Sequence, residues 1–216
     1  MTVSPCLPRN RPNRQAVIAR TVAKLPDAAT MAARIDAVLA QATDSEVIDG
    51  HAWYGAAASI ARIVADGHGI DQSSGAGIIA ALSPQCSWDE NIVRALAHCD
   101  GDMVGATADS LRKADAIASG GRPVDVLGGR KVRSFWRNID GRDQYVTVDR
   151  HAVAIVFGRA LSDREIKILE KLGAYTIIAA AYRAAARRHG IAPSTLQAIT
   201  WLAWRRLKGL ADTDTF

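Results

Sequence analysis

Aromatic residues, cysteines and long apolar runs are all scarce in this sequence, and each scarcity excludes a class of protein. Only 6% of the 216 residues are aromatic although 49% are hydrophobic. Alanine is abundant and is the best helix former, so packed helices are favoured over a β-sandwich. Three irregularly spaced cysteines are too few for a disulfide framework and suit a reducing cytoplasm. No run of about 18 or more apolar residues suggests a membrane-spanning helix, and residues 1–15 lack the apolar core of a signal peptide.

Common nucleotide-binding and metal-binding motifs are also missing. The sequence has no P-loop, no dinucleotide fingerprint and no C-x-x-C pair. Its five histidines do not show the spacing of metal ligands such as H-E-x-x-H. Only His151, two positions after Asp149, lies next to another candidate residue. We therefore expect neither a metal ion nor another cofactor.

The positive charge is concentrated in the second half of the chain. The formal net charge is +5 for the whole sequence. Residues 122–208 contain 17 Lys and Arg but 7 Asp and Glu, whereas the remainder contains 10 and 15. A basic half suits a phosphate-rich partner such as nucleic acid. The alternative interpretation places these charges on solvated helix faces.

Apolar periodicity and capping residues predict an all-α fold. Asp71, Thr107 and Ser162 are the expected N-caps of three helices. Residues 44–50 are expected to form a connection, and the β-branched residues 145–148 the one short strand. A single helical domain should cover residues 15–208, between a loose arm at 1–14 and a frayed tail at 209–216. The expected helices lie at residues 15–25, 28–41, 52–66, 72–82, 87–98, 107–119, 130–138, 152–157, 163–172, 175–189 and 193–208.

Residues 127–157 contain the most informative segment. Gly128 and Gly129 follow Leu127 and predict a tight turn, since glycine tolerates positive φ. A short basic helix should begin at Arg130, and a second, apolar helix should follow Asp149. Lys131 and Asp149 would then lie in the first turns of two helices, joined by a loop short enough to bring them near each other.

Two segments resemble the helix-hairpin-helix DNA glycosylases of the endonuclease III type. In that family a glycine-rich hairpin holds a DNA phosphate, a lysine follows in a G-R-K run, and a V-D-x-H segment supplies an aspartate. The matching runs here are residues 129–131 and 148–151. The segment IIAALSPQCSWDEN at 78–91 resembles the family's L-L-S-x-Q segment, whose glutamine probes the hole left by an everted base; that residue is Gln85 here. The similarity covers residues 71–208.

The chain also departs from the family pattern. The family hairpin usually reads L-P-G-V-G, whereas this one is shorter and lacks the proline. The C-terminal iron–sulfur cluster cannot form, because Cys6, Cys86 and Cys99 cannot supply four thiolates and none lies near the C-terminus.

The resemblance implies a two-lobed helical fold with a cleft between the lobes. One lobe would comprise residues 72–145, and the other residues 15–70 together with 147–208. Asp149 would stabilise positive charge on the sugar and Lys131 would attack C1′. The alternatives are a helix cap for Asp149, and a phosphate contact or an ordinary surface position for Lys131. The expected DNA contacts are Gln85, Trp88, Asn91, Gly128, Gly129, Arg130, Arg133, Ser134, Arg150 and His151.

Three functions remain open. The first is a DNA-base glycosylase, with or without lyase activity, that flips a damaged or modified base out of duplex DNA and cleaves its N-glycosidic bond. The second is a phage enzyme on the same scaffold that replaces a pyrophosphate on a hydroxymethyl-uracil base with an amine or amino acid. The third is a catalytically silent DNA-binding module. In each case we expect a monomer that binds double-stranded DNA in the cytoplasm of a bacterial or phage-infected cell.

Overall fold

A computed structural model describes residues 13–102 and 105–210, and every regular element in these ranges is a helix. The all-α prediction is therefore confirmed. The predicted arm and tail lie largely outside the described residues. The first elements are α1 (Arg14–Val22), α2 (Ala28–Leu39), α3 (Asp44–His68), α4 (Gln72–Leu82), α5 (Trp88–Cys99), α6 (Ala108–Ala118) and α7 (Pro123–Val126). They are followed by α8 (Arg130–Ile139), α9 (Arg150–Phe157), α10 (Asp163–Ile166), the 3-10 helix η1 (Lys167–Glu170), α11 (Ala174–His189) and α12 (Pro193–Leu207).

The predicted N-caps begin helices in the structure. Asp71 accepts a hydrogen bond from the Ser74 N–H at 2.9 Å, and Thr107 accepts one from the Ser110 N–H at 3.2 Å. Ser162 opens α10 with a capping box. These caps satisfy backbone N–H groups that have no partner within the helix.

Two local predictions were wrong. Residues 44–50 are helical, because Thr43 and Glu46 form a capping box that starts α3 at Asp44. Residues 145–148 form no strand. The three β-branched residues of that segment, 146–148, are fully buried between helices, which satisfies their packing preference without a sheet.

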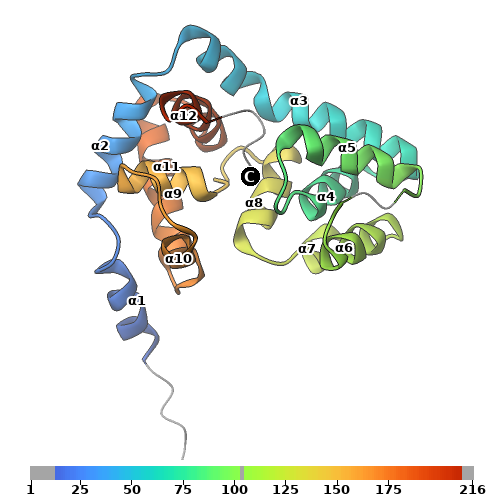
Figure 1. The fold of residues 1–216 in the computed structure, drawn as a ribbon, viewed down its shortest axis with the longest axis horizontal. Coiled ribbons are helices and arrows are strands. Elements are labelled where there is room, and N and C mark those ends of the chain that lie inside the picture. Colours follow the sequence, from blue (N-terminus) through green and yellow to red (C-terminus); the bar gives the residue numbers. More distant parts are fainter. Residues whose placement is uncertain (1–12, 103–104, 211–216) are drawn as a thin grey trace, which may run out of the picture.

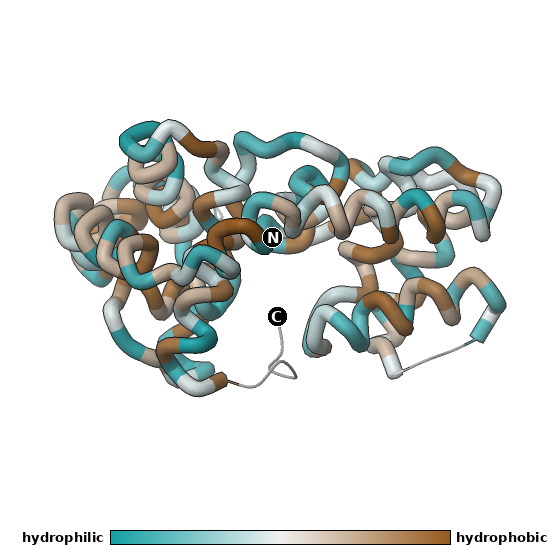
Figure 2. Tube along the Cα trace, turned by 90° about the horizontal axis from the view of Figure 1, so that it is seen from above, coloured by the Kyte–Doolittle hydropathy of each residue, from teal (hydrophilic) through white to brown (hydrophobic). Residues whose placement is uncertain are grey.

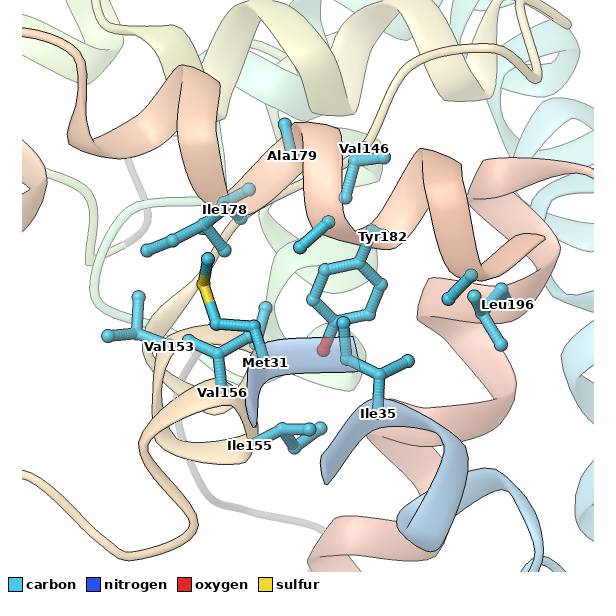
Figure 3. Packing of buried hydrophobic residues seen from close by; sticks show 14 of the residues in the cluster. Met31, Ile35, Val146, Val153, Ile155, Val156, Ile178, Ala179, Tyr182 and Leu196 are labelled. Atoms are coloured by element: carbon cyan, nitrogen blue, oxygen red, sulfur yellow. The ribbon is translucent and has the colours of Figure 1, made fainter. Parts of the chain in front are cut away.

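The helices form two groups, each around its own hydrophobic core. Figures 1 and 2 show the arrangement of the helices from two directions. The first core is built by α2, α9, α11 and α12 (Figure 3). Tyr182, Ile35 and Ile178 are among its fully buried side chains. Each such apolar side chain contributes about 1.5–3 kcal/mol relative to an exposed position.

The second core is built by α3, α4, α6 and α8. Helix α4 is buried from Ser74 to its end at Leu82, as expected from its almost wholly apolar sequence. Gly75 allows α4 to pack closely against α3: a Cβ atom at this position would lie 2.2 Å from the Ala61 carbonyl oxygen.

Helix α3 extends along both cores (Figure 1). Its residues Ala57, Ala61 and Val64 belong to the second core. Near its N-terminus, Gly50 packs against Ile199 of α12, and a Cβ there would lie 2.4 Å from Ile199 Cγ1. The expected division assigned residues 15–70 to one lobe, whereas α3 contacts both groups of helices. Within the described ranges, no helix is long and apolar enough to cross a membrane.

Candidate functional site

Asp149 is a buried N-cap with one uncommitted oxygen. It precedes α9 and is 1% exposed. Its Oδ1 accepts a hydrogen bond from the Ala152 N–H at 2.7 Å, so the predicted capping role is confirmed. Its Oδ2 is buried without a hydrogen-bond partner among the described residues. The N-terminus of a helix favours negative charge at this point, and Oδ2 is available to interact with a group that carries positive charge.

Lys131 occupies the first turn of α8, and Asp149 acts on it electrostatically. Burial is the main influence and lowers the pKa of Lys131, and Arg150 lowers it further. The negative charges of Asp149 and of an ionised Cys86 would act in the opposite direction without cancelling the effect of burial. The ammonium is therefore easier to deprotonate than an ordinary lysine, and a neutral amine is a nucleophile. The sequence correctly predicted that these two residues lie near each other.

The segment before Asp149 is fixed by side chains of distant helices. The Tyr175 hydroxyl donates to the Val146 carbonyl at 2.8 Å and accepts from the Val148 N–H at 3.1 Å. Thr147 Oγ1 lies 3.2 Å from the Tyr54 hydroxyl and 3.1 Å from the Asn138 amide. These contacts take the place of strand pairing and hold Asp149 at the junction of the two cores. Sequence reasoning did not identify these partners, because they come from α3, α8 and α11.

The loop between α4 and α5 lies next to Lys131, since Cys86 acts electrostatically on its amine. Burial raises the pKa of the Cys86 thiol, which favours its neutral form. Gln85 precedes it, is exposed, and has φ +61°. Among the described residues, Gln85 is the only non-glycine with positive φ. Such a conformation is strained, and strain of this kind clusters at functional sites.

The glycine turn leads directly into α8. Gly129 is the N-cap of this helix with φ +67°, and no described atom lies within 4 Å of a Cβ built on it. No side chain caps this helix end. Arg133 Nε donates to the Leu127 carbonyl at 2.6 Å, which links α8 to the residue just before the turn. Gly128 and Gly129 are exposed, so the first N–H groups of α8 can be approached from outside.

Aromatic rings from α3, α5, α8 and α12 collect beside the second core. The Trp53 ring lies 4.9 Å from Trp88, 6.0 Å from Phe135 and 6.2 Å from Trp201. Trp88 was an expected DNA contact and is half-buried here. Trp53 was not predicted to belong to the site; no local pattern distinguishes it from a core residue of α3.

Three of the expected DNA contacts are buried. Asn91 is 1% exposed, and its Nδ2 donates to the Ile79 carbonyl at 3.1 Å, which joins α5 to α4. The prediction that Asn91 contacts DNA is therefore corrected to a packing role. Ser134 and His151 are 7% and 5% exposed, and each lines a pocket rather than an open surface. Arg130 and Arg150 are exposed, and Arg150 pairs with Asp163 at 2.6 Å.

A pocket of about 330 Å³ opens beside Arg150 and His151, with apolar walls that include Leu161 and Trp204. It lies on the first-core side of the site.

Within the described ranges, no group of three or more His, Cys, Asp or Glu side chains is arranged to hold a metal ion.

Comparison with known proteins identifies the family. Neither the curated proteins nor the solved structures contain a match. A model of a family of unknown function, DUF7178, matches residues 18–208. This match covers most of the chain and includes Gln85, Lys131 and Asp149, so the chain belongs to the family DUF7178.

Proposed function

We propose that this protein is a DNA-base glycosylase with a two-lobed, helix-hairpin-helix glycosylase-like fold. The observation that carries the proposal is the electrostatic influence of Asp149 on the buried amine of Lys131. Burial lowers the pKa of the amine, while the carboxylate acts on it electrostatically and keeps one oxygen uncommitted. The two residues come from helices that belong to different cores. A substrate on which both residues act would have to bind at the junction of these cores.

The proposed reaction occurs at C1′ of a deoxyribose whose base has left the helix stack. The neutral amine of Lys131 attacks C1′ as the bond from C1′ to the base nitrogen breaks, and the electron pair of that bond leaves with the base. The Asp149 carboxylate stabilises the positive charge that develops on the sugar. The attached amine loses a proton, and the sugar ring opens to a Schiff base. If water takes the place of Lys131, the same carboxylate supports simple hydrolysis.

Three features support DNA as the substrate. The exposed turn at Gly128 and Gly129 leads into the uncapped N-terminus of α8, and such helix ends attract phosphate. The strained, exposed Gln85 stands on the loop next to Lys131. Residues 122–208 carry the excess of positive charge, which favours binding to a polyanion.

The test uses short duplexes that contain one uracil, oxidised, alkylated or hydroxymethylated base. Mass spectrometry measures both the released base and the intact strand. A glycosylase releases the free base and leaves an abasic strand. If the strand keeps its base but increases or decreases in mass, the reaction is base modification and not glycosidic cleavage.

Asp149→Asn should reduce the single-turnover rate by at least about 100-fold, which corresponds to roughly 2.7 kcal/mol of transition-state stabilisation. Asparagine caps a helix as well as aspartate does, so circular dichroism should show an unchanged fold. Affinity for DNA should persist, because the substitution removes a negative charge. Unchanged turnover in this variant would contradict the assignment.

Borohydride trapping tests Lys131 separately. The wild type should form a covalent adduct with DNA that Lys131→Gln does not form. Base release without any adduct would leave Asp149 as the centre of a water-using glycosylase.

A further inference from the structure

Helices α8 and α11 enclose a second pocket, of about 260 Å³, whose walls carry four arginines. Arg130, Arg133 and Arg137 are three and four positions apart on α8, so they share one helix face. Arg183 reaches the same pocket from α11. Helix α8 contributes to the second core and α11 to the first, so the pocket lies across their junction.

The pocket has no anionic group of its own. None of its lining residues is acidic. Within the described residues, no carboxylate forms a salt bridge with any of the four arginines. Like charges held close together repel each other, and proteins commonly balance such a group with acidic side chains. The lining itself supplies no charge that balances the arginines, which favours an anionic ligand.

The arginines are held in place by neutral acceptors. Arg130 donates to Thr176 Oγ1, and Arg183 Nε donates to the Gln144 carbonyl at 3.2 Å. The Arg137 guanidinium stacks over the Tyr145 ring, 4.7 Å from its centroid. Its Nε is buried without a hydrogen-bond partner among the described residues. A guanidinium has five N–H donors, so most of the donors in this pocket remain available to a ligand.

We propose that this pocket binds a phosphate group. Guanidinium groups match the oxygens of phosphate in geometry and charge, and the remaining lining residues, which include Tyr145 and Thr176, are uncharged. If the phosphate belongs to a DNA strand, the proposal rests on the proposed function and adds a backbone contact at the junction of the cores. A free phosphate or phosphorylated small molecule would use the same chemistry.

The first experiment titrates the protein with inorganic phosphate and with pyrophosphate by calorimetry. Arg183→Gln and Arg137→Gln should each weaken binding by about 10-fold or more, since each removes a charged hydrogen-bond donor. Arg187→Gln is the matched control, because Arg187 is exposed on the same helix one turn away and carries the same charge. It should bind phosphate as the wild type does. Arg183→Gln also loses the hydrogen bond to the Gln144 carbonyl. If that variant fails to fold, Arg137→Gln still tests the pocket.

The second experiment measures affinity for an undamaged duplex across a salt series. Loss of one phosphate contact should make the slope of log K against log salt shallower by about 0.9 in Arg183→Gln, and leave it unchanged in Arg187→Gln. Weaker binding of both phosphate and DNA supports a backbone phosphate as the ligand. Weaker binding of phosphate alone supports a free phosphate-bearing ligand. Equal binding by both pocket variants and the control would overturn the proposal. None of these results depends on base release, so the pocket and the proposed function can fail independently.

Discussion

The Tyr54 hydroxyl donates a hydrogen bond to Oε1 of Gln197 at 2.9 Å and so joins α3 to α12. Gln197 is only 4% exposed, so water cannot readily replace a lost donor. Tyr54→Phe should therefore lower the free energy of unfolding by about 1–3 kcal/mol, the usual cost of an unsatisfied buried acceptor. Urea denaturation followed by circular dichroism measures this. Tyr145→Phe is the control and should change stability by less than about 0.5 kcal/mol. Equal effects in the two variants would contradict the importance of this contact.

The glycines of α3 and α4 should respond to alanine in opposite ways. Gly75→Ala places a Cβ 2.2 Å from the Ala61 carbonyl oxygen, so α3 and α4 must separate. This overpacking should cost about 1–3 kcal/mol in unfolding free energy. Gly55→Ala meets no described atom within 4 Å and should stabilise α3 by up to about 1 kcal/mol, because alanine favours the helix. Thermal and urea denaturation compare the two. A stabilising Gly75→Ala would disprove the close packing.

The two glycines of the turn before α8 provide a matched pair of substitutions. Gly129 has φ +67° and ψ 143°, a combination that is almost restricted to glycine, so Gly129→Ala should lower the free energy of unfolding by about 1–3 kcal/mol through backbone strain. Gly128 does not have positive φ, and a Cβ there would lie 3.7 Å from Lys113 Nζ, an ordinary contact. Gly128→Ala should therefore be tolerated. Urea denaturation checks this by comparing the unfolding free energies of the two variants. Equal destabilisation by both substitutions would argue against a special turn at Gly129.

The lowered pKa of Lys131 predicts a pH dependence of the reaction. The rate of adduct formation should rise with pH through an apparent pKa below the ordinary value of 10.5, because only the neutral amine attacks C1′. Single-turnover trapping between pH 5 and pH 10 measures the profile. A rate that stays low up to pH 9 and is still rising steeply at pH 10 would show that the amine is not activated.

The same shift predicts a pH dependence of stability. The unfolded chain binds the proton of Lys131 more tightly than the folded protein does, so stability increases with pH between the lowered folded pKa and 10.5. Lys131→Met removes this contribution. The free energy of unfolding of this variant should exceed that of the wild type most below the pKa of Lys131 in the folded protein. The difference should disappear above about pH 10.5. An advantage that does not vary with pH would contradict the burial of the charged amine.

Local signals in the sequence predicted most helices, because caps and apolar spacing act within a few residues. Asp71, Thr107 and Asp149 all accept bonds from N–H groups three positions ahead. The error at residues 44–50 was avoidable, since Thr43 and Glu46 already show the spacing of a capping box. The error at residues 145–148 was not, because the Tyr175 hydroxyl that takes the place of strand pairing comes from a helix 27 positions beyond Val148.

The site could be predicted only in part. Resemblance to a family identified Lys131 and Asp149, whose proximity depends on one short loop. Trp53 and Arg183 reach the junction of the cores from distant helices, so no motif indicated them. The three arginines on one face of α8 were visible as a pattern. Their lack of acidic partners became apparent only when α8 was seen beside α11.

The position of α3 along both cores has a consequence for how the molecule unfolds. Helix α3 packs on α12 where Gly50 lies against Ile199, and on α4 where Ala61 lies against Gly75, so one continuous helix belongs to the packing of both cores. The two cores should therefore lose structure together, in a single cooperative transition. A substitution that weakens either core should then lower the stability of the other core as well, and with it the stability of the junction that holds Lys131 and Asp149.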